Sequence, residues 1–356
     1  MKRLSLLPIS LGGLLCLSSV QAQTSSSTPP IGFIRKDCPA NSDTRVSIPL
    51  ERQSVFIGPI TTPSGSLITT QGNPGWTADE FKFSATSQKD TYYVLFLSGA
   101  KRGRDFNVTG NGENTLSLDL KGDNLNDVVE GDRIKLLPHW NLDAAFPAGE
   151  GVETSESALS IKSQVLMPET DATGINFAAS ETFFYSSSWQ KFGGSADGSR
   201  VLAPHRYMVV RNKDQATSPV FVGVVPSDYQ AAPLRVPKGN DKQDNLVSLN
   251  RPTPVKLRDS DLISSGAFAT SPSPLAITDQ LLVFNDDQAA INKSASKTYY
   301  HYDGRWLLFG GSFAADADEG DEVIFTPGTG VIIRKAGTGD ASEKTIYWSH
   351  DDPTSN

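Results

Sequence analysis

Two similar stretches decide the fold of this chain: Ile175-Asn-Phe-Ala-Ala-Ser-Glu-Thr-Phe-Phe-Tyr185 and Ile291-Asn-Lys-Ser-Ala-Ser-Lys-Thr-Tyr-Tyr-His301. Each is followed by Trp-x-x-Phe-Gly-Gly. A matching apolar segment lies further on and ends at Arg211 in one copy and at Arg334 in the other. Agreement over roughly 40 residues at shared spacing is typical of duplicated supersecondary units. The sequence therefore predicts an internal repeat.

The N-terminus has the composition of a secretory signal peptide. Lys2 and Arg3 precede an apolar region from Leu4 to Leu17, and the small-residue signal Val20-Gln-Ala22 follows. This order predicts export and cleavage after about Ala22, which places the protein in the periplasm, at the outer envelope or outside the cell. No later apolar run approaches the roughly 20 residues that a membrane-spanning helix needs. We therefore expect no transmembrane segment.

Charge and cysteine content narrow the partners and the chemistry. Removal of residues 1–22 leaves 30 basic against 40 acidic residues, a net charge of −10, which disfavours nucleic acid as a partner. Cys38 is then the only cysteine, so neither an intramolecular disulfide nor a multi-cysteine metal site is expected. Cys38 is either a small buried apolar residue or a thiol that pairs between chains.

Short strand patterns run along the whole chain. Apolar alternation and β-branched or aromatic runs are separated by Gly, Pro, Asn and Asp, and Asn111-Gly lies between two alternating runs, which is a strong hairpin signal. The two half starts, Asp43 and Asp244, are 201 residues apart, whereas Asn176 and Asn292 are only 116 apart. The first half should therefore contain an insertion of about 85 residues.

These patterns predict an all-β protein made of two related β-sandwich or barrel-like half-repeats, with a small antiparallel β domain inserted in the first half. The expected boundaries are a signal peptide at 1–22, a flexible leader at 23–32, the first half-repeat at 33–64 and 161–228, the insertion at 65–160, a linker at 229–243, the second half-repeat at 244–350 and a tail at 351–356.

An aromatic strand pair is the candidate ligand-binding site. In the run Tyr299-Tyr-His-Tyr302, alternate side chains face opposite sides of a strand, so one face belongs to the core and the other can be exposed. Tyr300, Tyr302 and Trp306 are the residues that would stack on sugar rings. Packing of the repeat alone also accounts for the pattern.

An acidic turn is the candidate metal site. Asp316, Asp318 and Asp321 could offer carboxylate oxygens to Ca²⁺, although the segment lacks the EF-hand order and its bidentate glutamate. A solvated turn is the alternative. No other cofactor is expected, because the four histidines are scattered and the nucleophile-elbow and dinucleotide-binding motifs are absent from the sequence.

Several of these motifs resemble an uncharacterised group of exported, often paralogous proteins from verrucomicrobial bacteria. The resemblance is carried by Ser42-Asp-Thr-x-Val-Ser-Ile-Pro49, Tyr92-Tyr93, Ser98-Gly-Ala-x-x-Gly-Arg104, Val108-Thr-Gly-Asn111, Gly131-Asp132, both Ile-Asn units and Ile332-Ile-Arg-Lys335. It covers most of the chain after the signal peptide. The group has no established activity. Some of its members look like substrates of a C-terminal sorting system, whose hydrophobic tail this sequence lacks.

The sequence favours an exported, non-enzymatic β protein with a structural, adhesive or interaction role, whose partner is an envelope or extracellular protein or a polysaccharide. One alternative is a carbohydrate-binding module that uses the aromatic strand pair. A second is a glycan-active enzyme whose carboxylates come from distant strands, with a separation of roughly 5 to 10 Å across a cleft. The sequence contains no catalytic motif, which argues against enzymatic activity. Carboxylates contributed by distant strands leave the question open.

Overall fold

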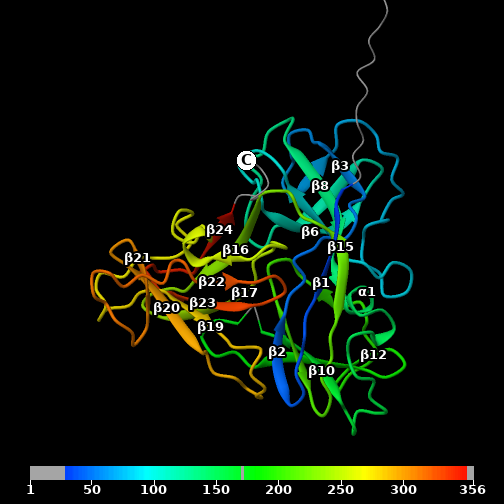
Figure 1. Ribbon diagram of the computed structural model, residues 1–356. Coiled ribbons are helices and arrows are strands. Elements are labelled where there is room, and N and C mark those ends of the chain that lie inside the picture. Colours follow the sequence, from blue (N-terminus) through cyan, green and yellow to red (C-terminus); the bar gives the residue numbers. More distant parts are fainter. Residues whose placement is uncertain (1–28, 170–171, 351–356) are drawn as a thin grey trace, which may run out of the picture.

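The computed structural model describes residues 29–169 and 172–350 of the chain (Figure 1). Strands make up 39% of the structure and helices 3%, which confirms the predicted all-β class. Over the same described ranges, no helix is long and apolar enough to cross a membrane. The predicted signal peptide at 1–22 and the tail at 351–356 lie outside the described residues.

The first half surrounds one apolar core. A five-stranded antiparallel sheet has the order β12-β11-β10-β14-β2, and two short ribbons, β1–β15 and β9–β13, complete it. The core includes Phe146, Phe183 and Trp189. The elements are β1 (Ile31–Arg35), β2 (Ser42–Val46), β9 (Trp140–Asn141), α1 (Leu142–Ala145), a 3₁₀ turn (Pro147–Gly149), β10 (Ser163–Pro168), β11 (Ala179–Tyr185), β12 (Trp189–Lys191), β13 (Val201–Leu202), β14 (Met208–Asn212) and β15 (Val220–Val224).

The second half has a second five-stranded sheet in the order β17-β23-β19-β20-β21, accompanied by the ribbons β16–β24 and β18–β22. Its core includes Tyr299, Trp306 and Trp348. The elements are β16 (Gln230–Val236), β17 (Lys242–Val247), β18 (Val255–Lys256), a 3₁₀ turn (Leu257–Asp259), β19 (Gln280–Val283), β20 (Lys297–Tyr302), β21 (Arg305–Leu308), β22 (Val323–Phe325), β23 (Val331–Ala336) and β24 (Lys344–His350).

Residues between Arg52 and His139 form a third unit, a curled six-stranded sheet in the order β3-β8-β5-β6-β7-β4. Its strands are β3 (Phe56–Pro59), β4 (Leu67–Thr69), β5 (Tyr92–Phe96), β6 (Asp105–Asn111), β7 (Thr115–Asp119) and β8 (Arg133–Pro138). The sheet therefore begins before the expected boundary at residue 65 and ends well before residue 160. The predicted hairpin turn forms at Asn111-Gly112, where the Gly112 amide donates to the Thr115 carbonyl at 3.0 Å.

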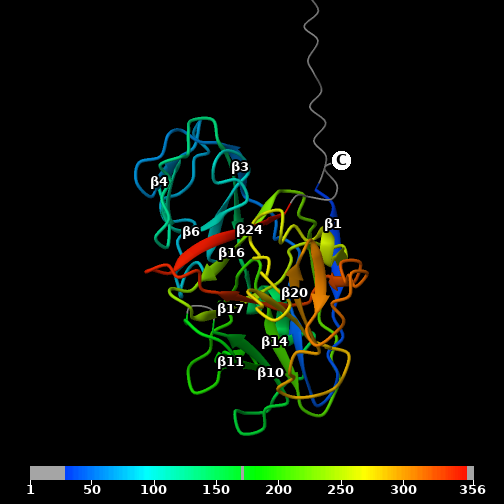
Figure 2. The same ribbon diagram turned by 90° about the vertical axis from the view of Figure 1, so that its left-hand side faces the viewer.

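The two halves use their strands in corresponding order. In each half the strand that contains the repeated Trp is at the edge of the five-stranded sheet, and Trp189 and Trp306 are 1% and 4% exposed. Figure 1 shows the second half beside the first, with the third unit above both. The third unit lies against the β16–β24 ribbon (Figure 2), where the Ala231 amide donates to the Gly103 carbonyl at 3.0 Å.

Residues 229–243, expected to be a linker, instead contain the whole of β16 and the start of β17. Pro233 is tolerated in β16 because the ribbon has only two strands, so a missing amide donor breaks no ladder on the second side. Leu234 and Val236 are buried. Ile31, which opens β1, also lies within the expected leader at 23–32.

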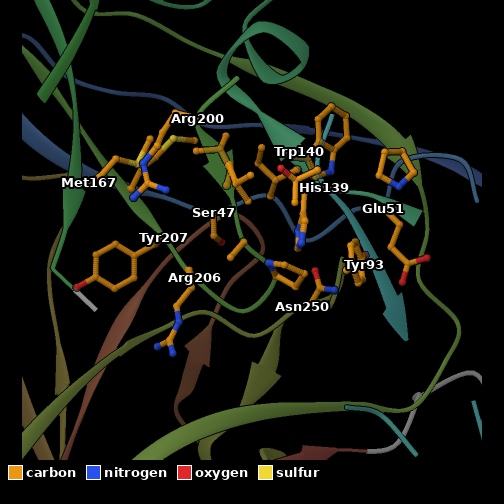
Figure 3. Close-up of a pocket in the computed structure, with 18 of the residues that line it drawn as sticks. Ser47, Glu51, Tyr93, His139, Trp140, Met167, Arg200, Arg206, Tyr207 and Asn250 are labelled. Atoms are coloured by element: carbon orange, nitrogen blue, oxygen red, sulfur yellow. The ribbon is translucent and has the colours of Figure 1, made fainter. Parts of the chain in front are cut away.

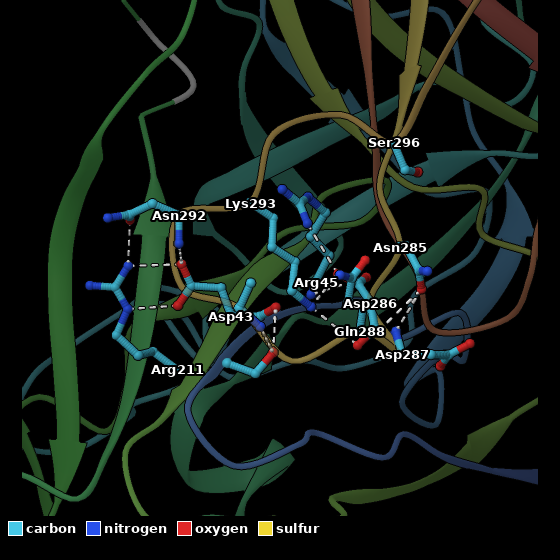
Figure 4. Close-up of polar contacts among 12 residues, drawn as sticks. Asp43, Arg45, Arg211, Asn285, Asp286, Asp287, Gln288, Asn292, Lys293 and Ser296 are labelled. Atoms are coloured by element: carbon cyan, nitrogen blue, oxygen red, sulfur yellow. Dashed lines mark hydrogen bonds and ion pairs between the residues drawn. The ribbon is translucent and has the colours of Figure 1, made fainter.

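The repeated Ile-Asn motifs join the two halves. Arg211 donates to Asp43 at 2.6 and 2.8 Å within the first half and to the Asn292 side chain of the second half at 2.8 Å (Figure 4). The Asn292 amide returns a bond to Asp43 at 2.8 Å. The Asn motif of the second half thus completes an ion pair of the first half. The Asn motif of the first half does the same for an ion pair of the second half.

In the reverse contact, Arg334 donates to Asp244 at 2.7 and 3.0 Å and to the Asn176 side chain at 3.0 Å. The Asn176 amide donates to Asp244 at 2.8 Å. Both asparagines have a positive φ, of 58° for Asn176 and 53° for Asn292, a conformation that Asn adopts more readily than most residues. We refer to these two contacts as the reciprocal Asn clamps.

Candidate functional site

The aromatic strand pair predicted to bind sugar lies mostly inside the second half. Tyr300 and Trp306 are each 4% exposed, and only Tyr302 is partly accessible. The structure buries both faces of β20, so these three side chains form no stacking platform as they stand. Burial also raises the pKa of Tyr300. The alternation left the second face of the strand open to be exposed, with packing of the repeat as the alternative, and the burial of Tyr300 agrees with that alternative.

The acidic turn does not gather a metal site. Arg258 donates to both Asp318 and Asp321, at 3.2 and 3.1 Å, and Lys256 donates to Asp321 at 3.0 Å. Asp318 also accepts from the backbone amide of Trp306 at 3.2 Å. Asp316 is not among these contacts. Across residues 29–169 and 172–350, no group of three His, Cys, Asp or Glu side chains is placed to hold a metal ion.

A deep cleft lies where the third unit meets the two halves. It consists of a cavity of about 400 Å³ and an adjoining hollow of about 740 Å³, which share Asn107, Lys121 and Arg206 in their walls. Cavities of roughly 300 to 1,000 Å³ are the usual size of small-molecule sites. Figure 3 shows the smaller cavity, with Met167, Arg200 and Tyr207 on one side and Tyr93, His139 and Trp140 on the other.

Strand alternation explains why the third unit presents polar groups to this cleft. In β6, Phe106 and Val108 enter the core of the curled sheet. Asp105 and Asn107 therefore face the opposite side. Asp119 of the neighbouring strand β7 is paired directly with Asn107, so its side chain faces the same side of the sheet as Asn107. One side of the sheet thus makes its own core and the other side makes a wall of the cleft.

Two polar side chains in the smaller cavity have hydrogen-bonding capacity to spare. Tyr93 and Asn250 are each 6% exposed and line the cavity, and neither the Tyr93 hydroxyl nor the Asn250 amide has a hydrogen-bond partner in the described chain. Most buried polar groups in proteins are paired, so an unpaired group at a cavity wall is suited to a ligand or to water. Burial raises the pKa of Tyr93 well above its usual value.

His139 supports the Tyr93 side of the cavity. Its ring stacks on Tyr93 with the centroids 4.3 Å apart, and its Nε2 lies 2.7 Å from the Asn107 side-chain oxygen. Burial, aided by the nearby positive charges of Lys121 and Arg52, lowers the pKa of His139 to about 3. The imidazole is therefore neutral at physiological pH, and Nε2 carries the proton that it donates to Asn107. This arrangement fixes the Tyr93 ring.

A buried ionic cluster holds the third unit against the first half. Lys135 of β8 donates to Glu51 of the first half and to Asp228 at 2.9 Å. Burial raises the pKa of Glu51 despite the neighbouring ammonium group. Burial also works to lower the pKa of Lys135, but Glu51 and Asp228 outweigh it and raise that pKa. Because removal of one member would leave an uncompensated buried charge, the cluster fixes the position of the cleft wall.

Most charges in the larger hollow are already neutralised. Arg104 pairs with Asp123 at 3.0 Å, and Arg235 donates to Glu343 at 2.5 and 3.0 Å. Asp105 is different, since it lines the hollow with no side-chain partner in the described part of the chain. Burial raises the pKa of Asp105 to about 6, although Lys121 and Arg206 oppose the effect.

The cleft therefore suits a neutral ligand rich in hydroxyl groups. Asp105 disfavours an anion, and Lys121 and Arg206 disfavour a cation. A hydroxyl group both donates and accepts hydrogen bonds, so it can satisfy a carboxylate, an ammonium group, a phenol and an amide in turn. The partly buried indole of Trp140 is held by a 2.8 Å bond to the Leu50 carbonyl and adds an aromatic wall.

No protein-family model, curated protein or solved structure matches this chain. The resemblance to exported verrucomicrobial proteins therefore stays a prediction, and the cleft must be interpreted from its own chemistry.

Proposed function

We propose that this chain is an exported interaction protein that binds a neutral saccharide in the cleft between the third unit and the two halves. The observation that carries the proposal is the pair of unpaired buried polar groups, the Tyr93 hydroxyl and the Asn250 amide, at the wall of a cavity of about 400 Å³. Export rests on the predicted signal peptide. The sugar-binding residues differ from the aromatic strand pair that the sequence suggested.

Internal duplication is part of the proposal. It is supported by the same strand order in the two five-stranded sheets and by the reciprocal Asn clamps, in which Asp43, Arg211 and Asn292 have the same roles as Asp244, Arg334 and Asn176. The Asn of each copy contacts the other copy, as in a two-fold symmetric dimer fused into one chain. Such a scaffold would hold the cleft rigidly.

The test is binding of the protein, residues 23–356, to an array of neutral and anionic oligosaccharides, followed by calorimetric titration of the best ligand. Tyr93→Phe removes one hydroxyl and keeps the ring that stacks on His139, so we expect affinity to fall about 3- to 10-fold, as for one lost hydrogen bond. Tyr302→Phe is the matched control and should bind as the parent protein does.

Two results would contradict the proposal. If the protein binds none of the neutral saccharides on the array, the proposed binding function is wrong. Binding that is lost in Tyr302→Phe but intact in Tyr93→Phe would place the site on β20 instead of in the cleft.

A further inference from the structure

Two carboxylates face the larger hollow from neighbouring strands. Asp105 opens β6 and Asp119 ends β7, and both line the hollow. Asp119 pairs directly with Asn107, and Asp105 lies two residues before Asn107 on the same face of β6. Asp105 and Asp119 are therefore diagonal neighbours across the hairpin.

Diagonal neighbours on one face of an antiparallel pair are about 7 to 8 Å apart. Paired carboxyl groups that hydrolyse glycosidic bonds are about 5 to 9.5 Å apart, and the upper part of that range leaves room for a water molecule. That spacing is between the residues, and the two short Asp side chains on one face can bring their carboxyl groups into the range suited to that reaction.

The surroundings of the two carboxylates differ in the way that acid and base roles require. Asp105 is half-buried beside Tyr93 and has no side-chain hydrogen-bond or ion-pair partner among the described residues, and burial raises its pKa to about 6 against the nearby charges of Lys121 and Arg206. Asp119 is exposed and accepts a 3.2 Å bond from the Lys121 amide. Two carboxyl groups with opposed environments mark a general acid and a general base.

We infer that Asp105 and Asp119 hydrolyse a glycosidic bond of the bound saccharide, with Asp105 as general acid and Asp119 as general base. This inference rests on the proposed function, because the substrate is the neutral saccharide of the cleft. The Tyr93 and Asn250 cavity holds one part of that chain, and the adjoining hollow holds the bond that is cleaved.

Water is the co-reactant. The Asp105 carboxylic acid gives its proton to the glycosidic oxygen as the bond from the anomeric carbon to that oxygen breaks. The Asp119 carboxylate removes a proton from a water molecule as the oxygen of that water bonds to the anomeric carbon. One sugar leaves with a new hydroxyl group and the other becomes a free hemiacetal. Exchange with solvent then reprotonates Asp105 and deprotonates Asp119.

The experiment incubates the parent protein and its variants with the reducing-end-labelled neutral oligosaccharide selected in the binding test, and measures cleavage and affinity in parallel. Asp105→Asn and Asp119→Asn should each lower the cleavage rate at least about 100-fold, the scale of a lost acid or base, while affinity changes less than about 10-fold. Glu343→Gln is the control, because Glu343 lines the same hollow but is paired with Arg235; it should cleave normally.

The outcomes separate the two proposals. Binding without cleavage by the parent protein overturns this inference and leaves the binding function intact. Absence of binding removes both. Cleavage at the parent rate by Asp105→Asn or by Asp119→Asn overturns the role assigned to that residue.

Discussion

Single residues hold this protein together through contacts that cross from one half to the other. Asn176 and Asn292 each combine a left-handed backbone with a side chain that accepts from an arginine of the other half. Few residue types meet both requirements, since most side chains are strained at positive φ. The presence of Asn at the same place in both repeated stretches follows from this double requirement.

Substitution of the clamp asparagines should separate the contribution of the side-chain hydrogen bond from that of the left-handed backbone. Asn176→Gly keeps the left-handed backbone and loses only the side-chain bond, so we expect a loss of about 0.5 to 1.5 kcal/mol in the free energy of unfolding. Asn176→Ala adds about 1 to 2 kcal/mol of backbone strain. Urea denaturation of the variants, and of the same pair at Asn292, measures this. Equal costs for Gly and Ala would mean that the backbone is not strained.

Buried histidines make the stability depend on pH. Burial lowers the pKa of His139 to about 3 and of His205 to about 4, against about 6.5 in the unfolded chain. Below pH 6.5 each of these histidines binds a proton in the unfolded chain but stays neutral in the folded chain. The free energy of unfolding is therefore unaffected by them above pH 6.5 and decreases as the pH falls below that value. The cost is about 1.4 kcal/mol for each histidine per pH unit, or about 2 kcal/mol each at pH 5.

Urea midpoints at pH 7, 6 and 5 test this dependence. Asp105 acts in the opposite direction, because its pKa is raised to about 6 and the folded chain takes up its proton first, so it offsets part of the loss. His205→Gln removes one buried base and should flatten the pH dependence. An unchanged slope in that variant would show that His205 is not neutral in the folded protein.

At the scale of strands, the sequence predicted what local spacing determines. The repeated Trp-x-x-Phe-Gly-Gly places a tryptophan after each Ile-Asn stretch, and both tryptophans, Trp189 in β12 and Trp306 in β21, are buried in strands at sheet edges. It did not predict β16, because the partner of that strand is β24 at the far end of the chain and the Pro233 region has a linker-like composition. Strand pairing over such a distance leaves no local pattern.

The cleft was missed for a related reason. Asp105 and Asn107 are the polar positions of an alternating strand, and such positions normally face water. Here they face another unit of the same chain. The segment from Lys101 to Arg104 likewise has the composition of a solvated basic turn, yet Lys101 is 4% exposed and donates to Asp123 at 2.7 Å. Only the docking of the third unit turns these surfaces into a site.

Replacement of the two edge-strand tryptophans should show how similar their environments are. Trp189→Ala and Trp306→Ala should each cost about 3 to 5 kcal/mol in the free energy of unfolding. The Phe variants should differ. The Trp189 indole nitrogen is fully buried with no hydrogen-bond partner in the described chain, whereas the Trp306 indole nitrogen is not among such buried, unpaired atoms. Trp189→Phe removes that unsatisfied donor, so we expect it to cost about 1 kcal/mol less than Trp306→Phe. A larger cost for Trp189→Phe in denaturant unfolding would contradict this.

For the whole molecule, the proposed duplication makes the third unit an addition to a two-fold scaffold, and residues of this unit form one wall of the cleft. The β16–β24 ribbon of the second half is covered by this unit through Gly103 and Ala231. Among residues 29–169 and 172–350, no such unit covers the corresponding β1–β15 ribbon of the first half, and Phe33 is 73% exposed. On the proposed duplication, this difference between the halves comes from the third unit, which also supplies Tyr93, Asp105 and Asp119.

Removal of residues 53–138 tests this view of the architecture. The Arg52 guanidinium donates to the His139 carbonyl at 3.0 Å, so the Arg52 side chain reaches the backbone at the far end of the cut, and the second half continues from Arg251 to β18 without an insertion. Rejoining Arg52 to His139 should leave a chain with a β-rich circular dichroism spectrum and one cooperative unfolding transition. Its denaturant m-value should be smaller, because less surface is buried. Saccharide binding should disappear, because Tyr93 and the polar face of β6 are gone. A shortened chain without a cooperative transition would mean that the halves fold only together with the third unit.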